Sequence, residues 1–549
     1  MRSTPMEPPG SKLSPSLTRR FFLPIILLKS LLKVFKKEKS IRVLDDPKAV
    51  NARVDTYETY VNKLAHICDC AKGGKNVSAF AILQLGVIQY YFTSNDRDEE
   101  EYEQTSDYIT DVLNTLGKAT DEEVASRSTN SVPSAVFRRL LQKILHFNLS
   151  RIKGYIYSMK KHLGFCIKVT KEDPSKDARA ILEDLERLQT LLQFAAGETT
   201  PDQFVDGSQA VIQALDTMYN PQFKEYLHLR TQNNTEPDAP WIVVGHSIGR
   251  LLSYYYDVDI LFKARRQLPQ LFEDFEVHWI PSASTEKPTI PRAKLDAATI
   301  IGKMWNEPLK SEYTKHAALL EHSSISLNAE ITRIAKSFST TVHAEVNLHA
   351  HVLRLLRGQG DGHEVPAFFH GIKYIGCSKP TCRLCELWFA NHPSDVRVRK
   401  GHRNLYAEWR PADADGKAAE MRDVTLNRMI PLLRDEVAGD LRDRCATRSL
   451  NDSNDVPTNL PLTCTGTDVF STRSVVDDLA SMMGRMGMED VEERGVEVVA
   501  LGEEAASTPR AKADFWAVRK RVVVIEEDEE EDGDEGDGDG DDDGGGAKL

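Results

Sequence analysis

Two short clusters contain the residues whose types and spacing are best suited to chemistry. The first spans residues 341–345 (Thr-Val-His-Ala-Glu) and the second spans residues 377–385 (Cys-Ser-Lys-Pro-Thr-Cys-Arg-Leu-Cys). Cysteines three apart lie one turn apart on the same face of a helix, so Cys382 and Cys385 can bind one ion. Pro380 is typical of a helix start, where the positive end of the helix dipole lowers the pKa of thiols and favours metal binding.

His343 and Glu345 are two residues apart, which places them on nearly opposite sides of a helix interior. Both can reach one centre only from the first turn of a helix, and this is their predicted position. Three protein ligands leave a fourth tetrahedral position for water, and an unliganded carboxylate beside it can take a proton from that water. The pattern predicts a catalytic Zn²⁺ site in which His343, Cys382 and Cys385 bind the metal and Glu345 moves protons.

These clusters also carry a family resemblance. His-Ala-Glu at 343–345, followed by a strand and by Pro-Thr-Cys-Arg-Leu-Cys, resembles the His-x-Glu and Pro-Cys-x-x-Cys signature of cytidine deaminase-like enzymes. More narrowly, residues 374–385 and 401–409 are similar to a fungal-expanded family of nucleotide or nucleic-acid deaminases. The resemblance covers about residues 341–411. It implies a sheet with the two ligand-bearing helices on one side, and hydrolytic loss of an amino group from a nucleobase or similar substrate.

The resemblance also implies a mechanism and shows two departures. Zinc-bound water would lose a proton to Glu345, which would later protonate the leaving ammonia. The commonest form of the signature has proline directly before cysteine, whereas here Thr381 stands between Pro380 and Cys382. A hairpin usually precedes the His-x-Glu helix, but residues 325–338 have the pattern of a helix.

A structural zinc knuckle is the main alternative for the cysteine cluster. It would use Cys377 together with Cys382 and Cys385, and a fourth ligand such as His370 or His402. The chain would then be a non-enzymatic interaction module, with a protein partner bound through its helical half. This alternative leaves the His-Ala-Glu cluster unexplained. The remaining nearby histidines are predicted to pack or to lie at the surface: His349, His351 and His392.

A second enzymatic motif lies upstream of these clusters. Residues 245–249 (Gly-His-Ser-Ile-Gly) follow an apolar run and match the nucleophile elbow of serine hydrolases. Such an elbow needs several parallel strands before it, whereas residues 46–234 have mainly helical patterns. We therefore expect Ser247 to lie in a helix and not to act as a nucleophile.

Basic and aromatic residues around the cysteine cluster form a mixture typical of phosphate binding and base stacking. The candidate substrate-binding residues are Lys379, Arg399, His402, Tyr406 and Trp409. For Trp409 we favour packing in the core over contact with a base. Free nucleosides, nucleotides and polynucleotides all stay open as substrates.

The elements that must position these residues indicate an α+β protein. We expect an N-terminal all-α helical domain and a C-terminal α/β deaminase-like domain with a mixed sheet. The clearest helix begins at Asp173-Pro174 and ends at Gly197, and strand-like runs lie at 275–280 and 368–375. The predicted units are a mobile basic N-terminus with an amphipathic segment at 1–45, the helical domain at 46–235, the deaminase-like zinc domain at 240–442, a loop-rich extension at 443–525 and a disordered acidic tail at 526–549.

Composition constrains partners and compartment. The formal net charge is −13, but residues 526–543 hold 14 of the 83 acidic residues, so the rest of the 549-residue chain is nearly neutral and argues neither for nor against nucleic acid. Eight cysteines, three of them clustered, favour a reducing compartment and hence an intracellular protein, cytoplasmic or nuclear.

The apolar segment 21–35 is the one stretch that could be considered as a membrane-spanning helix. It contains Pro24, Lys29 and Lys33, so its uncharged runs are far shorter than the roughly 20 residues of a membrane-spanning helix. We predict no transmembrane segment. The basic character of residues 1–37 vaguely resembles a mitochondrial targeting sequence, but a helix that docks on the protein is the favoured interpretation.

Overall fold

The computed structural model describes residues 12–35, 38–40, 52–125, 133–197, 199–231, 238–290, 295–357 and 365–448. Within them the chain is mainly helical and contains a mixed sheet, so the predicted α+β class is confirmed. The acidic tail predicted at 526–549 and nearly all of the extension predicted at 443–525 lie outside the described residues.

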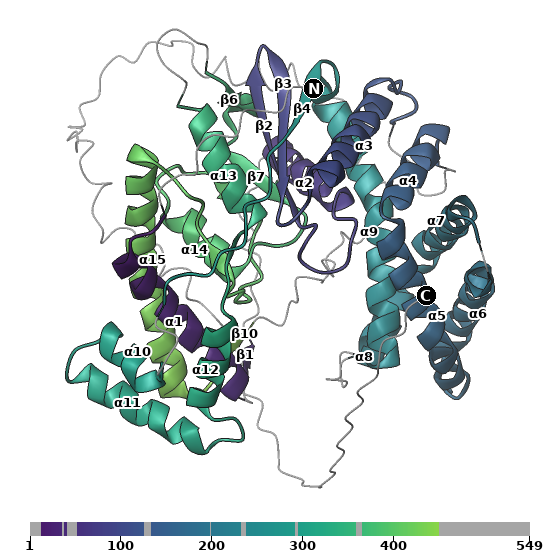
Figure 1. Cartoon of the computed structure of the whole chain (residues 1–549). Helices are drawn as coiled ribbons and strands as arrows, with labels where there is room; N and C mark the ends of the chain where they lie inside the picture. The colour runs from purple at the N-terminus through teal and green to yellow at the C-terminus, as the bar shows by residue number, and fades with distance from the viewer. Residues whose placement is uncertain are drawn as a thin grey trace, which may run out of the picture.

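One six-stranded sheet lies at the centre of the fold (Figure 1). Its strands are β2 (Ser78–Leu85), β3 (Val87–Ser94), β4 (Phe275–Trp279), β6 (Ala367–Phe368), β7 (Tyr374–Cys377) and β8 (Arg397–Val398). The order is β4-β3-β2-β7-β8, with β6 also paired to β2. The β2–β3 hairpin is antiparallel and turns at Gly86, whose φ of 71° suits glycine. Strand β7 is antiparallel to β2, and Ala79 lies opposite Cys377.

The hairpin β2–β3 corrects one expectation. Residues 46–235 were expected to be helical, yet they contain two of the central strands of the sheet. The hairpin expected from the resemblance lies directly before the metal-binding helix, whereas β2–β3 lies far earlier in the sequence. Residues 325–338 do form a helix, α12 (Leu327–Ser337). Because the sheet joins residues from both expected domains, the boundary placed near residue 235 does not separate the sheet from the helical region.

The sheet separates two hydrophobic cores. Side chains of β2 alternate between them, as strand geometry requires. Phe80 and Ile82 belong to the core formed with the helices between residues 52 and 267. Ala79 and Ala81 belong to the core formed with α1 and with the helices that follow residue 297. The candidate metal centre lies on the second side.

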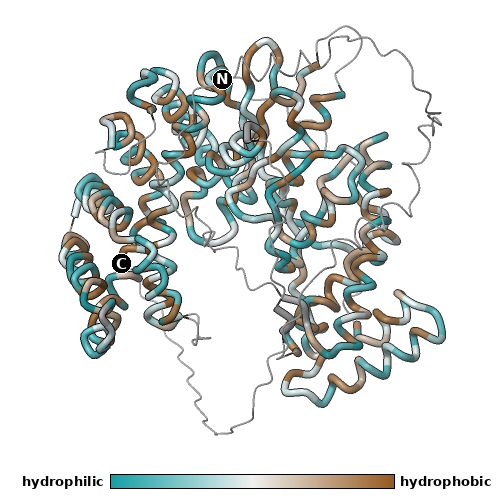
Figure 2. Tube along the Cα trace, turned by 180° about the vertical axis from the view of Figure 1, so that it is seen from behind, coloured by the Kyte–Doolittle hydropathy of each residue, from teal (hydrophilic) through white to brown (hydrophobic). Residues whose placement is uncertain are grey.

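The first side of the sheet carries most of the helical half, which lies at the right in Figure 1. Its helices are α2 (Ala52–Ile67), α3 (Glu99–Gly117), α4 (Ala135–Phe147), α5 (Leu149–Lys171), α6 (Lys176–Leu191), α7 (Pro201–Met218), α8 (Pro221–Thr231) and α9 (Pro240–Gln267), with short 3-10 turns η1 (Leu192–Ala196) and η2 (Pro269–Phe272). Hydrophilic and hydrophobic stretches alternate along these helices, as expected where one face meets a core (Figure 2). Helix α6 with η1 ends before Gly197, as predicted.

Ser247 lies in the middle of α9, the longest of these helices. Its hydroxyl donates a hydrogen bond to the Val243 carbonyl at 2.8 Å, and the side chain is buried. A nucleophile elbow places its serine on a sharp turn after a strand. The helical setting of Ser247 does not have that geometry.

The second side of the sheet carries the helices that surround the candidate site. They are α1 (Pro15–Val34), α10 (Ala297–Met304), α11 (Leu309–Leu319), α12, α13 (Ala344–Leu355), α14 (Arg383–Asn391) and α15 (Gly416–Asp443), with 3-10 turns η3 (Leu320–His322) and η4 (Phe369–Gly371). Two short parallel pairs complete the fold: β5 (Thr341–Val342) with β9 (Trp409–Arg410), and β1 (Glu38–Ser40) with β10 (Ala446–Arg448).

Helix α1 accounts for the apolar segment near the N-terminus. Phe21, Ile25 and Leu28 are fully buried, and the helix packs against α10, α12 and α15. Nearly every residue of the helix from Phe21 to Leu31 is buried, as is typical of a core helix. Among the described helices, none is both long enough and apolar enough to cross a membrane.

Candidate metal centre and active site

Two helix N-termini position the predicted ligands. His343 follows β5 and is the N-cap residue of α13. Cys382 is the N-cap residue of α14, where its Sγ accepts a hydrogen bond from the Cys385 amide at 3.5 Å. Thr381, the extra residue after Pro380, forms a bridge to Gly401 and leaves the helix start intact.

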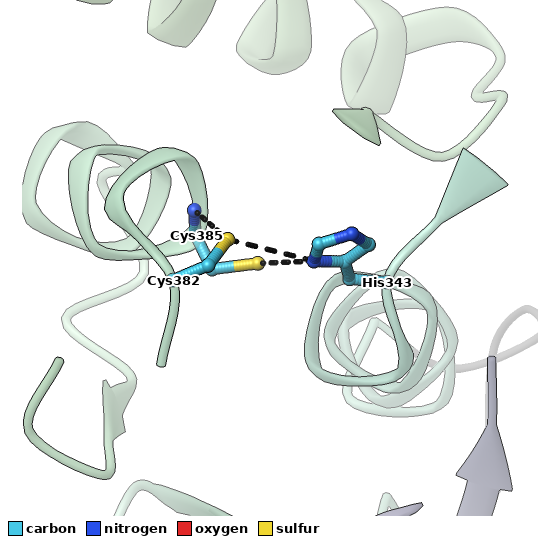
Figure 3. A group of neighbouring side chains, drawn as sticks. All are labelled: His343, Cys382 and Cys385. Carbon is cyan, nitrogen blue, oxygen red and sulfur yellow. Dashed lines mark hydrogen bonds between the residues drawn. The ribbon is translucent and has the colours of Figure 1, made fainter. Parts of the chain in front are cut away.

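The three side chains converge between the two helices. His343 Nδ1 lies 3.5 Å from Cys382 Sγ and 3.4 Å from Cys385 Sγ. All three ligand atoms lie within 4.8 Å of one another. Figure 3 shows the imidazole facing both sulfurs across the gap between the helices. In the described part of the chain, this is the only cluster of histidine, cysteine and acidic side chains with the spacing of a metal site.

The observed spacing fits a tetrahedral metal ion. Bonds of about 2.3 Å to sulfur and about 2.0 Å to nitrogen place these atoms about 3.5 Å apart around tetrahedral zinc. The measured separations of 3.4 and 3.5 Å match that value. Two thiols and one imidazole form a donor set suited to zinc. His343, Cys382 and Cys385 could therefore hold a metal ion without rearrangement.

Glu345 lies in the first turn of α13, beside this cluster but outside it. Its side chain is 4% exposed. Burial raises the pKa of the Glu345 carboxyl, and the nearby charge of His343 opposes the rise. The thiol of Cys377, at the end of β7, donates a hydrogen bond to this carboxylate, and burial raises the pKa of that thiol well above its ordinary value. Cys377 thus contacts the proposed proton carrier and not the metal cluster.

Comparison with known protein families shows what the metal-binding segment is similar to. A model of the OTT_1508-like deaminase family matches residues 342–413. This segment is a deaminase-like domain of the cytidine deaminase-like class. It begins directly before His343 and contains Glu345, Cys382 and Cys385. No curated protein and no solved structure matches the chain.

The matched segment does not contain the whole sheet. Strands β2, β3 and β4 lie between residues 78 and 279, outside the matched range. They nevertheless pair into one sheet with β7, which ends at Cys377. The deaminase-like domain is therefore built on strands that come from a distant part of the sequence.

Trp409 contacts the metal cluster from the side of the hydrophobic core. Its indole Nε1–H donates a hydrogen bond to Cys385 Sγ at 3.1 Å, and the side chain is fully buried. Its ring packs against Phe21 and Trp388, with centroids 5.7 and 5.9 Å away. Trp409 thus lies in the core, in line with the packing favoured from the sequence and not with the alternative role in base stacking, because pairing of β9 with β5 turns this residue inward.

We expect Trp409→Phe to weaken zinc binding about 10- to 100-fold, the usual cost of losing a hydrogen bond to a metal ligand. Zinc affinity is measured by competition with a chelator. Trp388→Phe is a matched control, because its indole donates to His349 Nδ1 at 3.3 Å and not to a cluster sulfur. Equal losses of affinity in both variants would mean that packing, not the bond to Cys385, supports the cluster.

The other candidate substrate residues take different positions. The Tyr406 ring is 41% exposed, and its centroid lies 6.4 Å from that of the His343 ring. His402 is buried, and its Nδ1 accepts a hydrogen bond from a neighbouring amide. Arg399 donates to the carbonyls of Cys377 and Ser378 at 3.3 and 3.0 Å, so it supports the site from behind. Of this set, Tyr406 has the exposed ring beside the cluster.

The structure adds one residue that the sequence did not indicate. Asn95, directly after β3, accepts a hydrogen bond from the Ala344 amide at 2.8 Å. Ala344 lies between His343 and Glu345, so Asn95 fixes the first turn of α13. Its own Nδ2 donates to the Gly74 carbonyl at 2.8 Å. Only recognition of the β2–β3 hairpin could have placed Asn95 here.

A histidine pair connects α13 to the end of α14, away from the metal cluster. His349 Nε2 lies 2.8 Å from Ser394 Oγ, and His392 Nδ1 lies 2.9 Å from the same hydroxyl. Both rings are buried, in line with the packing role predicted for them. Burial lowers the pKa of His349 well below its ordinary value, with smaller contributions from His392 and Arg357. Burial also lowers the pKa of His392 to about 4, with smaller contributions from Arg357 and Arg428.

These low pKa values predict acid sensitivity. In the unfolded chain a histidine has a pKa of about 6.5, so below that pH the unfolded state binds more protons than the folded state. The stability contribution of neutral His392 is complete above pH 6.5 and is lost as the pH falls toward 4. His392→Gln should flatten the fall in Tm over this window. The control is His322→Gln, an exposed histidine, and an unchanged pH slope in His392→Gln would contradict the prediction.

Proposed function

We propose that this protein is a zinc-dependent hydrolytic deaminase that acts on a nucleobase-containing or similar amine. The observation that supports this best is the convergence of His343, Cys382 and Cys385 from two helix N-termini, with the Glu345 carboxylate beside them. The family match over residues 342–413 is consistent with the same chemistry.

In this proposal the three converging side chains hold the ion. When bound, zinc lowers the pKa of a water molecule toward neutrality and so supplies the nucleophile. Three protein ligands leave the fourth tetrahedral position for that purpose.

Glu345 carries the proton. Its carboxylate oxygen accepts a proton from the attacking water and then delivers it to the leaving amino nitrogen. The carbon–nitrogen bond breaks, a carbon–oxygen bond forms and ammonia leaves. Burial raises the pKa of Glu345, which brings a carboxyl group closer to the range useful for both accepting and donating a proton. The bond from the Cys377 thiol and the helix start fixed by Asn95 hold the carboxylate in place.

Tyr406 supports a nucleobase as the reacting group. Its exposed ring lies beside His343, and aromatic side chains stack on the faces of bases. An exocyclic amine on a stacked base would then be presented to the centre between α13 and α14.

The alternative is an interaction module with a structural zinc site. Structural zinc sites normally use four protein ligands. Within the described residues, Cys377, His370 and His402 do not join the cluster of three, and Cys377 contacts Glu345 instead. These observations favour an open, catalytic site.

Ammonia release is the direct test. Purified zinc-loaded full-length protein is assayed with cytosine and adenine nucleosides, their nucleotides, and single-stranded DNA and RNA. We expect release from at least one of these amines and its loss after zinc is removed with a chelator. If the zinc-loaded protein releases no ammonia from any compound of the panel, the interaction module is favoured.

A further inference from the structure

A glycine- and lysine-containing loop lies next to the proposed active site. It connects α2 to β2 and spans residues 68–76 (Cys-Asp-Cys-Ala-Lys-Gly-Gly-Lys-Asn), of which residues 72–75 are exposed. Asn95 connects it to the metal-binding helix, because it accepts from Ala344 and donates to Gly74. Only one side chain therefore separates this loop from the residue between His343 and Glu345.

The loop also contacts the segment before the second ligand helix. Lys379 lies three residues before Cys382 and donates a hydrogen bond to the Gly73 carbonyl. Just after the loop, at the first residue of β2, the Ser78 carbonyl accepts a hydrogen bond from the Ser378 amide at 2.9 Å. The loop thus borders the N-termini of both ligand-bearing helices.

The tip of the loop is open and positively charged. Lys72 and Lys75 are exposed, and Lys75 lies 3.4 Å from the exposed carboxylate of Asp96. Gly73 has a φ of 101°, which a side chain rarely allows, and no atom lies within 4 Å of where a Cβ would stand at Gly73 or Gly74. Two flexible ammonium groups on an exposed glycine-containing turn are thus accessible there, a combination that suits an anion.

Buried arginines contact the base of the same loop. Arg97 donates to the Cys68 carbonyl, and Arg151 donates to the Asp69 carbonyl. Both arginine residues are only 6% exposed. Arg151 also forms an ion pair with the Asp69 carboxylate at 2.9 Å. These two side chains come from different elements, since Arg97 precedes α3 and Arg151 belongs to α5.

More basic than acidic side chains contact the loop. Arg97, Arg151 and Lys379 donate to its backbone carbonyls. The acidic partners are Asp69, which pairs with Arg151, and Asp96, which pairs with Lys75. In addition, Arg97 Nη1 is buried and makes no hydrogen bond within the described residues. Buried positive charge of this kind is costly unless an anion offsets it, and it raises the local concentration of anions.

We propose that this loop, through Lys72, Lys75 and Lys379, binds a phosphate of the substrate whose amine is removed at the metal centre. The inference rests on the proposed deaminase function and narrows its substrate to phosphate-bearing compounds. Buried Arg97 adds positive potential behind the loop that stabilises the anion. The phosphate belongs to a nucleotide or to a nucleic-acid strand, which share this chemistry.

Binding of single-stranded oligonucleotides by the full-length chain tests the proposal. Fluorescent DNA and RNA probes are titrated over a range of salt concentrations with wild type and with Lys72→Ala/Lys75→Ala. Each lost phosphate contact lowers the slope of log affinity against log salt by about 0.7, so the double variant should lose about 1.4. We expect its affinity to fall about tenfold at low salt, by the same counterion argument. Because both lysines are exposed, its Tm should equal that of wild type.

The matched control is Lys161→Ala/Lys168→Ala, which removes two exposed charges from α5. Equal losses in both double variants, or unchanged binding in Lys72→Ala/Lys75→Ala, would overturn the loop as the phosphate site. So would a wild-type protein that binds none of the phosphate-bearing probes. Competition by a nucleoside monophosphate but not by its nucleoside identifies a nucleotide ligand, and competition by unlabelled oligonucleotide alone identifies a strand.

Binding and turnover separate this inference from the deaminase function. If the protein binds these probes through the loop but releases no ammonia, the phosphate site is supported and the deaminase proposal is refuted. If the protein deaminates nucleosides and nucleotides equally well, and Lys72→Ala/Lys75→Ala has no effect, the deaminase proposal is supported and the phosphate site is refuted.

Discussion

Replacement of Glu345 by glutamine is expected to abolish ammonia release while zinc stays bound. The change keeps the size of the side chain and a carbonyl oxygen that can still accept the Cys377 hydrogen bond, but it removes the group that accepts and returns a proton. General acid–base catalysis contributes typically about 10²–10⁴-fold, and a residue that serves both steps should lie at the top of this range or above it. The measurements are kcat for ammonia release and metal content of the same preparations.

Glu386→Gln provides the matched control for this substitution. Glu386 is a first-turn carboxylate of α14, as Glu345 is of α13, but it follows the cysteines on the other ligand helix. Neutralising an acid near a helix N-terminus costs typically about 0.3–1 kcal/mol of stability. We expect Glu386→Gln to retain turnover within a few-fold. Turnover by Glu345→Gln close to that of wild type would refute the mechanism.

Cys382→Ser is expected to remove the metal from the protein. Wild type should contain about one zinc per chain, since three converging donors match a tetrahedral site with an open position. A serine hydroxyl is a far poorer zinc ligand than a thiolate, so metal analysis of purified Cys382→Ser should show little zinc.

The informative comparison is with Cys377→Ser, which changes a cysteine five residues away. Cys377 contacts Glu345 and lies outside the metal cluster, so this variant should keep its zinc. Circular dichroism of both variants tests whether the fold is retained. If Cys377→Ser lost its zinc and Cys382→Ser kept it, Cys377 and not Cys382 would be the metal ligand.

The metal cluster was predictable because its signals are local. His343 and Cys382 are helix N-cap residues and Cys385 lies in the first turn of α14; such positions have characteristic neighbours, here Pro380 before α14. The three-residue spacing of Cys382 and Cys385 follows from one helical turn. Sequence patterns within about ten residues therefore contained the geometry of each half of the centre, and the structure brings the halves together.

The central hairpin was not predictable by the same means. Residues 78–83 of β2 are all buried, because both faces of the sheet are covered. Such a strand shows no alternation of apolar and polar residues, and its apolar run resembles a buried helix. Its partner β7 lies about 300 residues later, and no local pattern indicates that pairing. Asn95 and the loop at 68–76 could not be assigned to the site without it.

The sequence also did not predict the direction in which some side chains near the site point. The sequence made Arg399 a candidate for substrate contact, and for Trp409 it favoured core packing without excluding contact with a base. In the structure Arg399 binds backbone carbonyls, and Trp409 donates to Cys385 from within the core. Whether such a residue points into a core or into a pocket depends on the pairing of short strands such as β5 with β9, which a two-residue segment does not encode.

The pairing of β2 with β7 has a consequence for biosynthesis. At about 5–20 residues per second, the ribosome needs roughly 15 to 60 s to make the chain between these two strands. During that time the hairpin has an edge of unpaired backbone groups, which can associate with other chains. We therefore expect nascent chains of this protein to depend on chaperones, and fragments that begin after residue 240 to aggregate because β7 lacks its neighbour.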